Sequence, residues 1–251
     1  MRPDDKPRGR IICAGLGPGA QDLMSLRTAR AIAAARHIAY FRKKGRKGRA
    51  RATVEGMLPA GVTEHAMEYP VTTELHFGSD GYRQALAAFY DDWAERLTDL
   101  TRTDDVVVLC EGDPFFYGSF MHLHLRLQDR AVIEVIPGIT GMSGCWTETG
   151  RPITWGDDVL TILPGTLPQD ELARRLSDAD AAVVMKIGRN LPRIRAALET
   201  AGRLDDAWLC VEGTMAGQRI APLAQVDLAD CPYFATVILH GNGRRPLAEI
   251  E

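Results

Sequence analysis

The stretch VVVLCEGDPFFYGS, residues 106–119, indicates the fold class of the chain. Its opening, residues 106–109, is an unbroken run of branched apolar side chains, typical of a strand buried on both faces of a parallel sheet. The run stops at an acidic turn, where Gly112 permits unusual backbone angles and Pro114 fixes φ and donates no hydrogen bond. Ligands usually bind open α/β sheets at the carboxyl ends of such strands. The turn is therefore a candidate ligand site, although a tight connection with a solvated aspartate would have the same sequence.

Short apolar runs alternate with helical patterns through the first half of the chain. We expect Asp22 to cap a helix over residues 22–35 and Asp80 to open a helix, with a loop at 72–79 between them. The helix after Asp80 has an apolar stripe at helical spacing, and another helix is expected at 120–128. This alternation is typical of a parallel sheet with crossover helices. The stripe is formed by Tyr82, Leu86, Phe89, Trp93 and Leu97, and the expected strands are 10–14, 37–41, 64–69, 106–109 and 131–136.

A second set of elements follows the loop-like composition around residues 150–152. Helices are expected at 169–177 and 191–201. We therefore predict an α/β protein of two domains, residues 1–138 with the glycine- and aspartate-rich loops and residues 139–251. The strands expected in the second set are 159–163, 181–187, 207–212 and 233–240.

Composition excludes several classes of protein. The chain has 251 residues and a net charge of −3, which argues against a surface built for nucleic acid. No apolar run approaches the ~20 residues that span a bilayer, and the polar start MRPDDKPRGR lacks the apolar core of a signal peptide. No pair of cysteines has metal or dithiol spacing and no H-E-x-x-H occurs, so no metal is expected. An odd number of cysteines, with Cys13, Cys110 and Cys210 in apolar runs, predicts a reducing cytoplasm.

Two motifs taken singly suggest other functions. Residues 15–20, GLGPGA, fit the dinucleotide fingerprint G-x-G-x-x-G/A, and basic residues after the second strand suit a 2′-phosphate. An NADP-dependent oxidoreductase would rest on this fingerprint alone, and Pro18 removes one backbone donor from the loop. The basic run 42–51 alone would suggest a tetrapyrrole carrier or an RNA-binding module.

Taken together, three loops resemble a known family. G-x-G-P-G at 15–19, G-D-P at 112–114 with Tyr117 just beyond, and P-G-I-T at 137–140 occur in an order similar to the tetrapyrrole methylase family. The resemblance covers roughly residues 9 to 243. It implies a two-domain α/β fold, with the active site in the cleft between the domains, and transfer of a methyl group from S-adenosylmethionine to a corrin or sirohaem precursor.

Finer features narrow the implied activity. Residues 112–127, 137–154 and 183–191 look most like family members that methylate precorrin-2 at C20, giving precorrin-3A in cobalamin biosynthesis. The alternatives left open are another corrin-ring methyltransferase, including the cobalt-precorrin-2 C20 enzyme, and the NADP-dependent oxidoreductase. No residue is identified as a general base, and Tyr117, Glu111 and His122 are the candidates by position.

The resemblance also implies a cofactor set in both domains, with S-adenosylhomocysteine as the product released. In the first domain it comprises Leu16, Pro18, Glu111, Gly112, Asp113, Phe116, Tyr117, Thr140 and Gly141. In the second it comprises Met185, Lys186, Ile187, Gly213, Thr214, Ala235 and Thr236.

The implied substrate is a polycarboxylate, which arginine and lysine bind well, and the family resemblance implies a homodimer. One or two residues of the basic run are expected to contact substrate, and the others to be solvated. The candidates are Arg42, Lys43, Lys44, Arg46, Lys47, Arg49, Arg126, Arg151 and Lys186.

Overall fold

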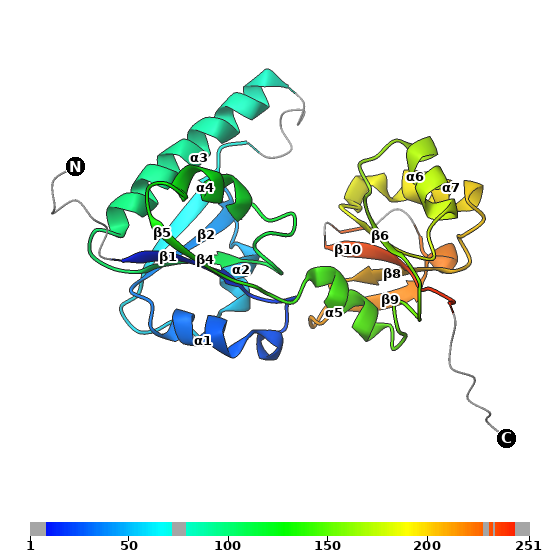
Figure 1. Ribbon diagram of the computed structural model, residues 1–251, viewed down its shortest axis with the longest axis horizontal. Helices are drawn as coiled ribbons and strands as arrows, with labels where there is room; N and C mark the ends of the chain where they lie inside the picture. The colour runs from blue at the N-terminus through cyan, green and yellow to red at the C-terminus, as the bar shows by residue number, and fades with distance from the viewer. Residues whose placement is uncertain (1–8, 72–78, 228–230, 233, 244–251) are drawn as a thin grey trace. The chain divides into compact units, whose positions relative to one another are not determined.

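The computed structural model describes residues 9–71, 79–227, 231–232 and 234–243. The chain divides into two compact units, residues 1–140 and 141–251. Each unit is built on a five-stranded sheet with helices packed against it (Figure 1). The α/β class expected from the sequence is confirmed in both units. Across the described residues, none of the helices combines the length and apolar character that crossing a bilayer requires.

The first unit has a fully parallel sheet in the order β3-β2-β4-β1-β5. The quoted stretch supplies β4, the central strand, and all five of its residues are buried. The predicted parallel sheet is therefore confirmed. Its strands are β1 (Arg10–Gly15), β2 (His37–Lys43), β3 (Thr63–Tyr69), β4 (Val106–Cys110) and β5 (Val132–Ile136), and its helices are α1 (Leu26–Ala33), α2 (Arg49–Thr53), α3 (Asp80–Leu100) and α4 (Phe120–Leu127).

Alternate side chains of β4 enter two different cores. Val106, Val108 and Cys110 pack with α3 and α4 residues, whereas Val107 and Leu109 pack on the opposite face. This alternation follows from the two-residue period of a strand, and burial on both faces explains the unbroken apolar run. The predicted α3 stripe is confirmed where Phe89, Trp93 and Leu97 are buried, while its first two members are half-buried.

The start of α1 differs from the expectation. Asp22 lies in a short 3-10 turn, Gln21–Leu23, and does not cap the helix. Ser25 is the N-cap instead: it has an extended backbone, and its hydroxyl accepts a hydrogen bond from the Thr28 N–H at 3.1 Å. The chain is extended again at Met24, so a helix could not run through from Asp22. The basic run, expected to be irregular, contains the short helix α2. The expected loop at 72–79 lies almost wholly outside the described residues.

The second unit has a mixed sheet in the order β6-β7-β10-β8-β9. Only β6 and β7 pair in parallel, and β10 runs antiparallel to both of its neighbours. Sequence reasoning missed β9, a four-residue edge strand ending in proline, and α5, which contains two glycines. The elements are α5 (Gly141–Glu148), β6 (Leu160–Pro164), α6 (Gln169–Ser177), β7 (Ala181–Met185), α7 (Leu191–Thr200), β8 (Ala207–Val211), β9 (Arg219–Pro222) and β10 (Ala235–Leu239).

Candidate cofactor and substrate site

Three loops of the first unit meet through glycine backbones at the carboxyl ends of β1, β4 and β5. Gly17 and Gly112 form a two-way backbone bridge, with N···O distances of 3.3 and 2.9 Å. A Cβ atom on Gly138 would lie 2.0 Å from the Gly112 carbonyl oxygen, and one on Gly15 would lie 2.6 Å from the Gly138 nitrogen. No side chain fits at either position, so glycine is required where the predicted G-x-G-P-G, G-D-P and P-G-I-T loops converge.

The carboxylates of the acidic turn bind backbone N–H groups. Asp113 accepts from Phe115 through Oδ1 at 2.9 Å and from Gly138 through Oδ2 at 3.1 Å, which joins the second loop to the third. Glu111 accepts from the N–H of Ala50 at 3.0 Å, at the start of α2. The two acidic residues therefore organise the backbone around the turn.

The Glu111 carboxyl group is partly desolvated although the residue as a whole is exposed. Desolvation raises its pKa, while the Ala50 N–H and the nearby Arg49 charge oppose that shift.

Tyr117 occupies an unusual backbone conformation. Its φ of 54° lies in the left-handed region, and its ring meets Phe116 edge-on with centroids 4.9 Å apart. Two residues later, the Ser119 hydroxyl bonds the Tyr69 hydroxyl and does not cap α4. Burial raises the pKa of Tyr69, so that phenol stays protonated at neutral pH. Ser119 and Tyr69 thus fix the far end of the loop that bears Tyr117, a role that no motif indicated.

Backbone strain among the described residues coincides with the predicted cofactor set. The non-glycine residues with positive φ are Tyr117, Lys186, Glu212 and Thr214, at 54°, 57°, 50° and 68°. Three of them belong to that set, and Glu212 directly precedes another member, Gly213. Residues held in this region concentrate at ligand sites, because surrounding structure must stabilise them. The strain is therefore evidence for these loops that does not depend on the sequence motifs.

The loop after β8 is held from several directions. Thr214 donates its N–H to Gln218 Oε1 at 2.6 Å, and Gln218 donates onward to Glu148 at 2.8 Å. A Cβ on Gly213 would lie 2.8 Å from the Cys145 sulfur, so the loop packs directly on that thiol. Sequence reasoning missed Gln218 and Glu148, because nothing local connects them to the loop.

Two buried cysteines and a threonine lie beneath this loop. Hydrogen bonding from Cys210, and then from Thr236, lowers the pKa of Cys145, whereas bonding to Cys145 and burial raise the pKa of Cys210. Thr236 lies on β10 directly opposite Cys210 on β8, and a Cβ on Gly213 would lie 3.0 Å from the Cys210 sulfur, so the last strand and the 213–214 loop are neighbours.

Several members of the predicted cofactor set are core residues. The side chains of Leu16 and Ile187 are fully buried in the two cores, so their backbones are what the loops present. Gly141 is the opposite case, since a Cβ there would meet no atom within 4 Å. Packing in the described residues therefore does not require glycine at 141.

Several of the basic candidates have identified partners. Arg42 pairs with Glu68 at 2.6 Å, and Arg126 pairs with Asp91 at 2.5 Å and lies over the Tyr90 ring. Arg151 lies over the Trp208 ring, 5.9 Å from its centroid.

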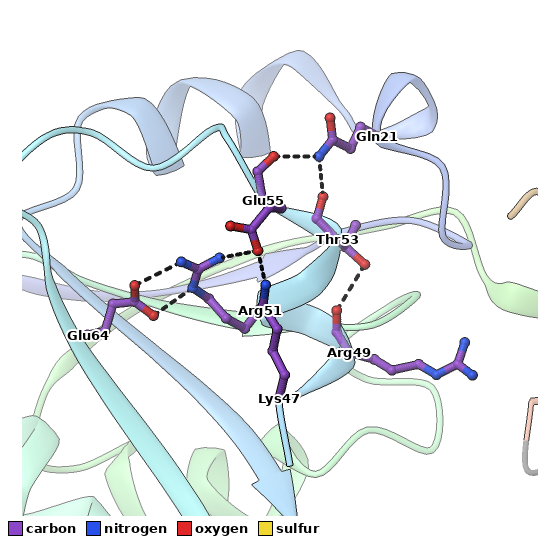
Figure 2. A network of polar contacts seen from close by, with 7 residues as sticks. All are labelled: Gln21, Lys47, Arg49, Arg51, Thr53, Glu55 and Glu64. Atoms are coloured by element: carbon purple, nitrogen blue, oxygen red, sulfur yellow. Dashed lines mark hydrogen bonds and ion pairs between the residues drawn. The ribbon is translucent and has the colours of Figure 1, made fainter. Parts of the chain in front are cut away.

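The basic run itself contains a compact polar network. Figure 2 shows Arg51 forked onto Glu64, Lys47 paired with Glu55, and the Arg49 side chain directed away from both carboxylates. Lys43, Lys44 and Arg46 are exposed.

His122 and His124 diverge on α4, as their spacing predicts. His122 is exposed and packs against Tyr90 with centroids 4.9 Å apart, whereas His124 contacts Phe115 and Phe120. Partial desolvation and the Arg126 charge lower the pKa of His122. Within the part of the chain that the structure describes, no group of three or more potential ligands is arranged to hold a metal ion.

Comparison with known proteins identifies the family. The two-sheet α/β fold with its glycine-joined loops is that of a methyltransferase, since the model of the Tetrapyrrole (Corrin/Porphyrin) Methylases matches residues 10–227. The chain belongs to the tetrapyrrole methylase family. The resemblance found in the three loops is thereby confirmed, and the single fingerprint at 15–20 does not mark an oxidoreductase.

Individual relatives carry corrin-related names. The chain is 48% identical over 239 residues to the precorrin-2 C(20)-methyltransferase of Sinorhizobium sp, covering 95% of this chain and 98% of that protein. It is 44% identical to the cobalamin biosynthesis protein CobIJ of Mycobacterium tuberculosis, covering 96% of this chain and 47% of that protein. Identity to the cobalt-precorrin-2 C(20)-methyltransferase of Salmonella typhimurium is 26%, covering 92% and 96%.

Solved structures share the fold. The cobalt precorrin-4 methyltransferase CbiF matches with a TM-score of 0.68 at 15% identity, covering 94% of this chain and 95% of that one. The uroporphyrin-III C-methyl transferase from Thermus thermophilus, crystallised with S-adenyl homocysteine, matches with a TM-score of 0.63 at 18% identity, covering 92% and 97%.

Proposed function

We propose that this chain methylates C20 of precorrin-2, producing precorrin-3A in cobalamin biosynthesis. The observation that supports this most directly is 48% identity to the Sinorhizobium precorrin-2 C(20)-methyltransferase over nearly the full length of both proteins. The lower identity of 26% to the Salmonella enzyme named for the cobalt-bearing substrate favours the metal-free substrate.

The cofactor we propose is S-adenosylmethionine, and the loops that the family resemblance implies are the candidates to hold it. The strained residues Tyr117, Lys186 and Thr214 and the glycine-only contacts at Gly15 and Gly138 fit a ligand held by backbone groups. An adenine ring needs a flat slot with backbone partners, and the buried Gly213 and Ala235 suit that requirement. When bound, the cofactor supplies a methyl group attached to a sulfonium, which is already electrophilic.

The task of the protein is then to hold the substrate carbon in line with that methyl group. Loops cross-linked by Asp113 and by the Gly17–Gly112 bridge are rigid enough for this positioning. A reduced tetrapyrrole makes its own meso carbon nucleophilic, so no side chain has to create the nucleophile. Methyl transfer makes the macrocycle cationic, and loss of a proton from the methylated carbon neutralises it, so a weak acceptor such as water is sufficient.

The substrate carboxylates should bind basic residues that are not already neutralised. Arg42 and Arg126 are paired with carboxylates, which makes them weaker candidates. Arg151, held over an aromatic ring, and the exposed Lys44 are the better ones. Substituting either with glutamine should raise KM for the tetrapyrrole without changing the affinity for S-adenosylhomocysteine.

Calorimetry and mass spectrometry test the proposal. Titrations with S-adenosylhomocysteine, NADPH and an RNA oligomer should show binding of the first alone. Incubation with S-adenosylmethionine and precorrin-2 should add one methyl group to the tetrapyrrole, with cobalt-precorrin-2 turned over more slowly. Binding of NADPH, or methylation at a ring carbon other than C20, would contradict the proposal.

We further propose a cytoplasmic homodimer. All five cysteines are free, which supports a reducing compartment. Light scattering at micromolar concentration should give about twice the chain mass of 27.6 kDa. A mass equal to one chain would contradict the dimer and leave the catalytic proposal unaffected.

A further inference from the structure

The carboxyl ends of β6 and β7 are joined more tightly than strand pairing requires. These strands are parallel, and Gly165, just after β6, donates its N–H to the Met185 carbonyl at 2.6 Å. A Cβ on Gly165 would lie 2.7 Å from Ile194 Cδ1 and 3.1 Å from the Met185 oxygen. The carboxyl ends of neighbouring parallel strands are where α/β sheets bind ligands. In the second unit, this edge is where Met185, Lys186 and Ile187 lie.

A side chain holds the strained residue at this edge. Lys186 has φ of 57°, and its carbonyl accepts a hydrogen bond from Asn190 Nδ2 at 3.2 Å. Asn190 Oδ1 in turn accepts from Arg193 Nη2 at 3.0 Å. Because a guanidinium only donates, the amide oxygen of Asn190 must face Arg193 and its NH2 group must face Lys186. The direction of the relay is therefore fixed by chemistry.

Arg193 also holds the loop after β6, with the same nitrogen that contacts Asn190. Its Nη2 also donates to the Gly165 carbonyl at 2.8 Å, so one guanidinium joins the residue after β6 to the residue after β7. Its Nε is buried and has no partner within the described residues. Arg193 is half-buried, and no carboxylate of the described chain pairs with it. A cation held only by neutral oxygens, with one donor unsatisfied, is a costly way to stabilise a helix.

We propose that Arg193, acting through Asn190, is a positioning residue of the cofactor site. It holds the Lys186 backbone in its left-handed conformation and keeps Gly165 against Met185, so that this edge is formed before S-adenosylmethionine binds. The inference rests on the proposed function, because it assigns a task to that same site. The role proposed for Arg193 requires no contact with cofactor or substrate.

The same helix supplies a matched control. Arg195 lies two residues further along α7 and also donates to backbone carbonyls, those of Ala224 at 3.3 Å and Val226 at 3.4 Å. It differs from Arg193 in holding a different part of the unit and in pairing with a carboxylate, that of Glu199 at 3.3 Å. Replacing Arg195 should therefore affect stability without affecting the edge at Lys186.

The experiment is calorimetry of the full chain with S-adenosylhomocysteine, alongside thermal unfolding. Arg193→Ala and Asn190→Ala should each weaken binding about tenfold, as expected for loss of a hydrogen bond that organises a site. The double variant should be no weaker than the worse single one, because the two residues act in series. Arg195→Ala should change the affinity less than about twofold while lowering Tm.

Asn190→Asp separates positioning from stability. It keeps an acceptor for Arg193 and strengthens that bond, but it removes the donor to the Lys186 carbonyl. Its Tm should therefore equal or exceed that of the wild type while its affinity falls about tenfold. In steady state, KM for S-adenosylmethionine should rise while KM for the tetrapyrrole stays the same.

Two results would overturn the inference in different ways. Folded Arg193→Ala and Asn190→Asp variants with wild-type affinity would remove the positioning role and leave the proposed function standing. A wild-type protein that binds no S-adenosylhomocysteine would remove the proposed function, and this inference with it.

Discussion

Asp113 and Gly138 are 25 residues apart in the chain, yet the Asp113 Oδ2 atom lies 3.1 Å from the Gly138 nitrogen. The other oxygen of the same carboxylate receives the Phe115 N–H at 2.9 Å. One side chain therefore sets both the shape of its own loop and the distance to the next. In G-D-P, the aspartate organises the loops that surround it, which differs from the simple view of an acidic turn attracting a cationic cofactor.

Asp113→Ala should weaken S-adenosylhomocysteine binding by ~1.5–3 kcal/mol, because hydrogen bonds to a charged group are lost and two loops are uncoupled. Asp113→Asn should also weaken it, since its NH2 group would face an N–H donor. Calorimetry measures both. Asp129→Ala, at an exposed position, is the control and should bind normally. Unchanged affinity in a folded Asp113→Ala protein would remove the turn from the site.

Ser119→Ala should destabilise the first unit more than Tyr69→Phe does. The alanine leaves the largely buried Tyr69 hydroxyl without one of its partners, which costs ~1–3 kcal/mol, whereas the phenylalanine removes that hydroxyl and leaves only the small Ser119 hydroxyl to be solvated. Urea unfolding of each variant gives the comparison. Ser177→Ala removes an exposed hydroxyl that donates to the backbone carbonyl of Arg174, and it should have almost no effect on stability. Equal losses from Ser119→Ala and Tyr69→Phe would contradict the argument.

Stability should fall as the solution is acidified through the range of histidine titration. Burial, and then the adjacent His37, lower the pKa of His65, whose Nε2 lies 3.0 Å from His37 Nδ1. The folded state therefore resists protonation that the unfolded chain accepts from about pH 6.5 downward. The stabilisation is complete above that pH and is lost as the pH falls towards the lowered pKa of His65 in the folded state. The urea midpoint of His65→Gln should depend less on pH between about 7.5 and 5.5 than that of the wild type, with the two curves parallel above pH 7.5. Identical slopes throughout would show that His65 is not responsible.

No single side chain should be an indispensable base. Tyr117→Phe, Glu111→Gln and His122→Asn should each lower turnover by much less than the 10²–10⁴-fold typical of a lost general base. Glu111→Gln is expected to act mainly by weakening the bond from the Ala50 N–H. Single-turnover methylation with both ligands saturating isolates the chemical step. A variant that binds both ligands normally and transfers no methyl group would identify the base and disprove this prediction.

The parts of the fold that were predictable depend on short-range patterns. β4 was recognisable because burial on both faces demands five consecutive apolar residues, and α3 because one face of a long helix must be apolar. The three loops were recognisable because backbone contacts at Gly15 and Gly138 exclude side chains and Gly112 has a φ of 62°, which favours glycine. In each case a physical constraint acts on neighbours in the sequence.

The parts that were missed depend on contacts between distant segments. Asp22 and Ser25 are both good N-caps, and only the extended backbone at Met24 decides between them. The supports of the strained loops, Gln218 for Thr214 and Asn190 for Lys186, are ordinary polar residues with no motif. The strain at Lys186, Glu212 and Thr214 was likewise invisible, because none of these residue types signals a positive φ.

The central place of β10 has a consequence for folding during synthesis. Every strand of the first sheet has been translated by Ile136, so that unit can form while the rest is still being made. The second sheet cannot, because β7 and β8 are neighbours of β10 and not of each other. Until Ala235–Leu239 emerges from the ribosome, both strands present unpaired hydrogen-bonding edges, which are templates for aggregation. A nascent chain arrested shortly before residue 235 should therefore need a chaperone for its second half only.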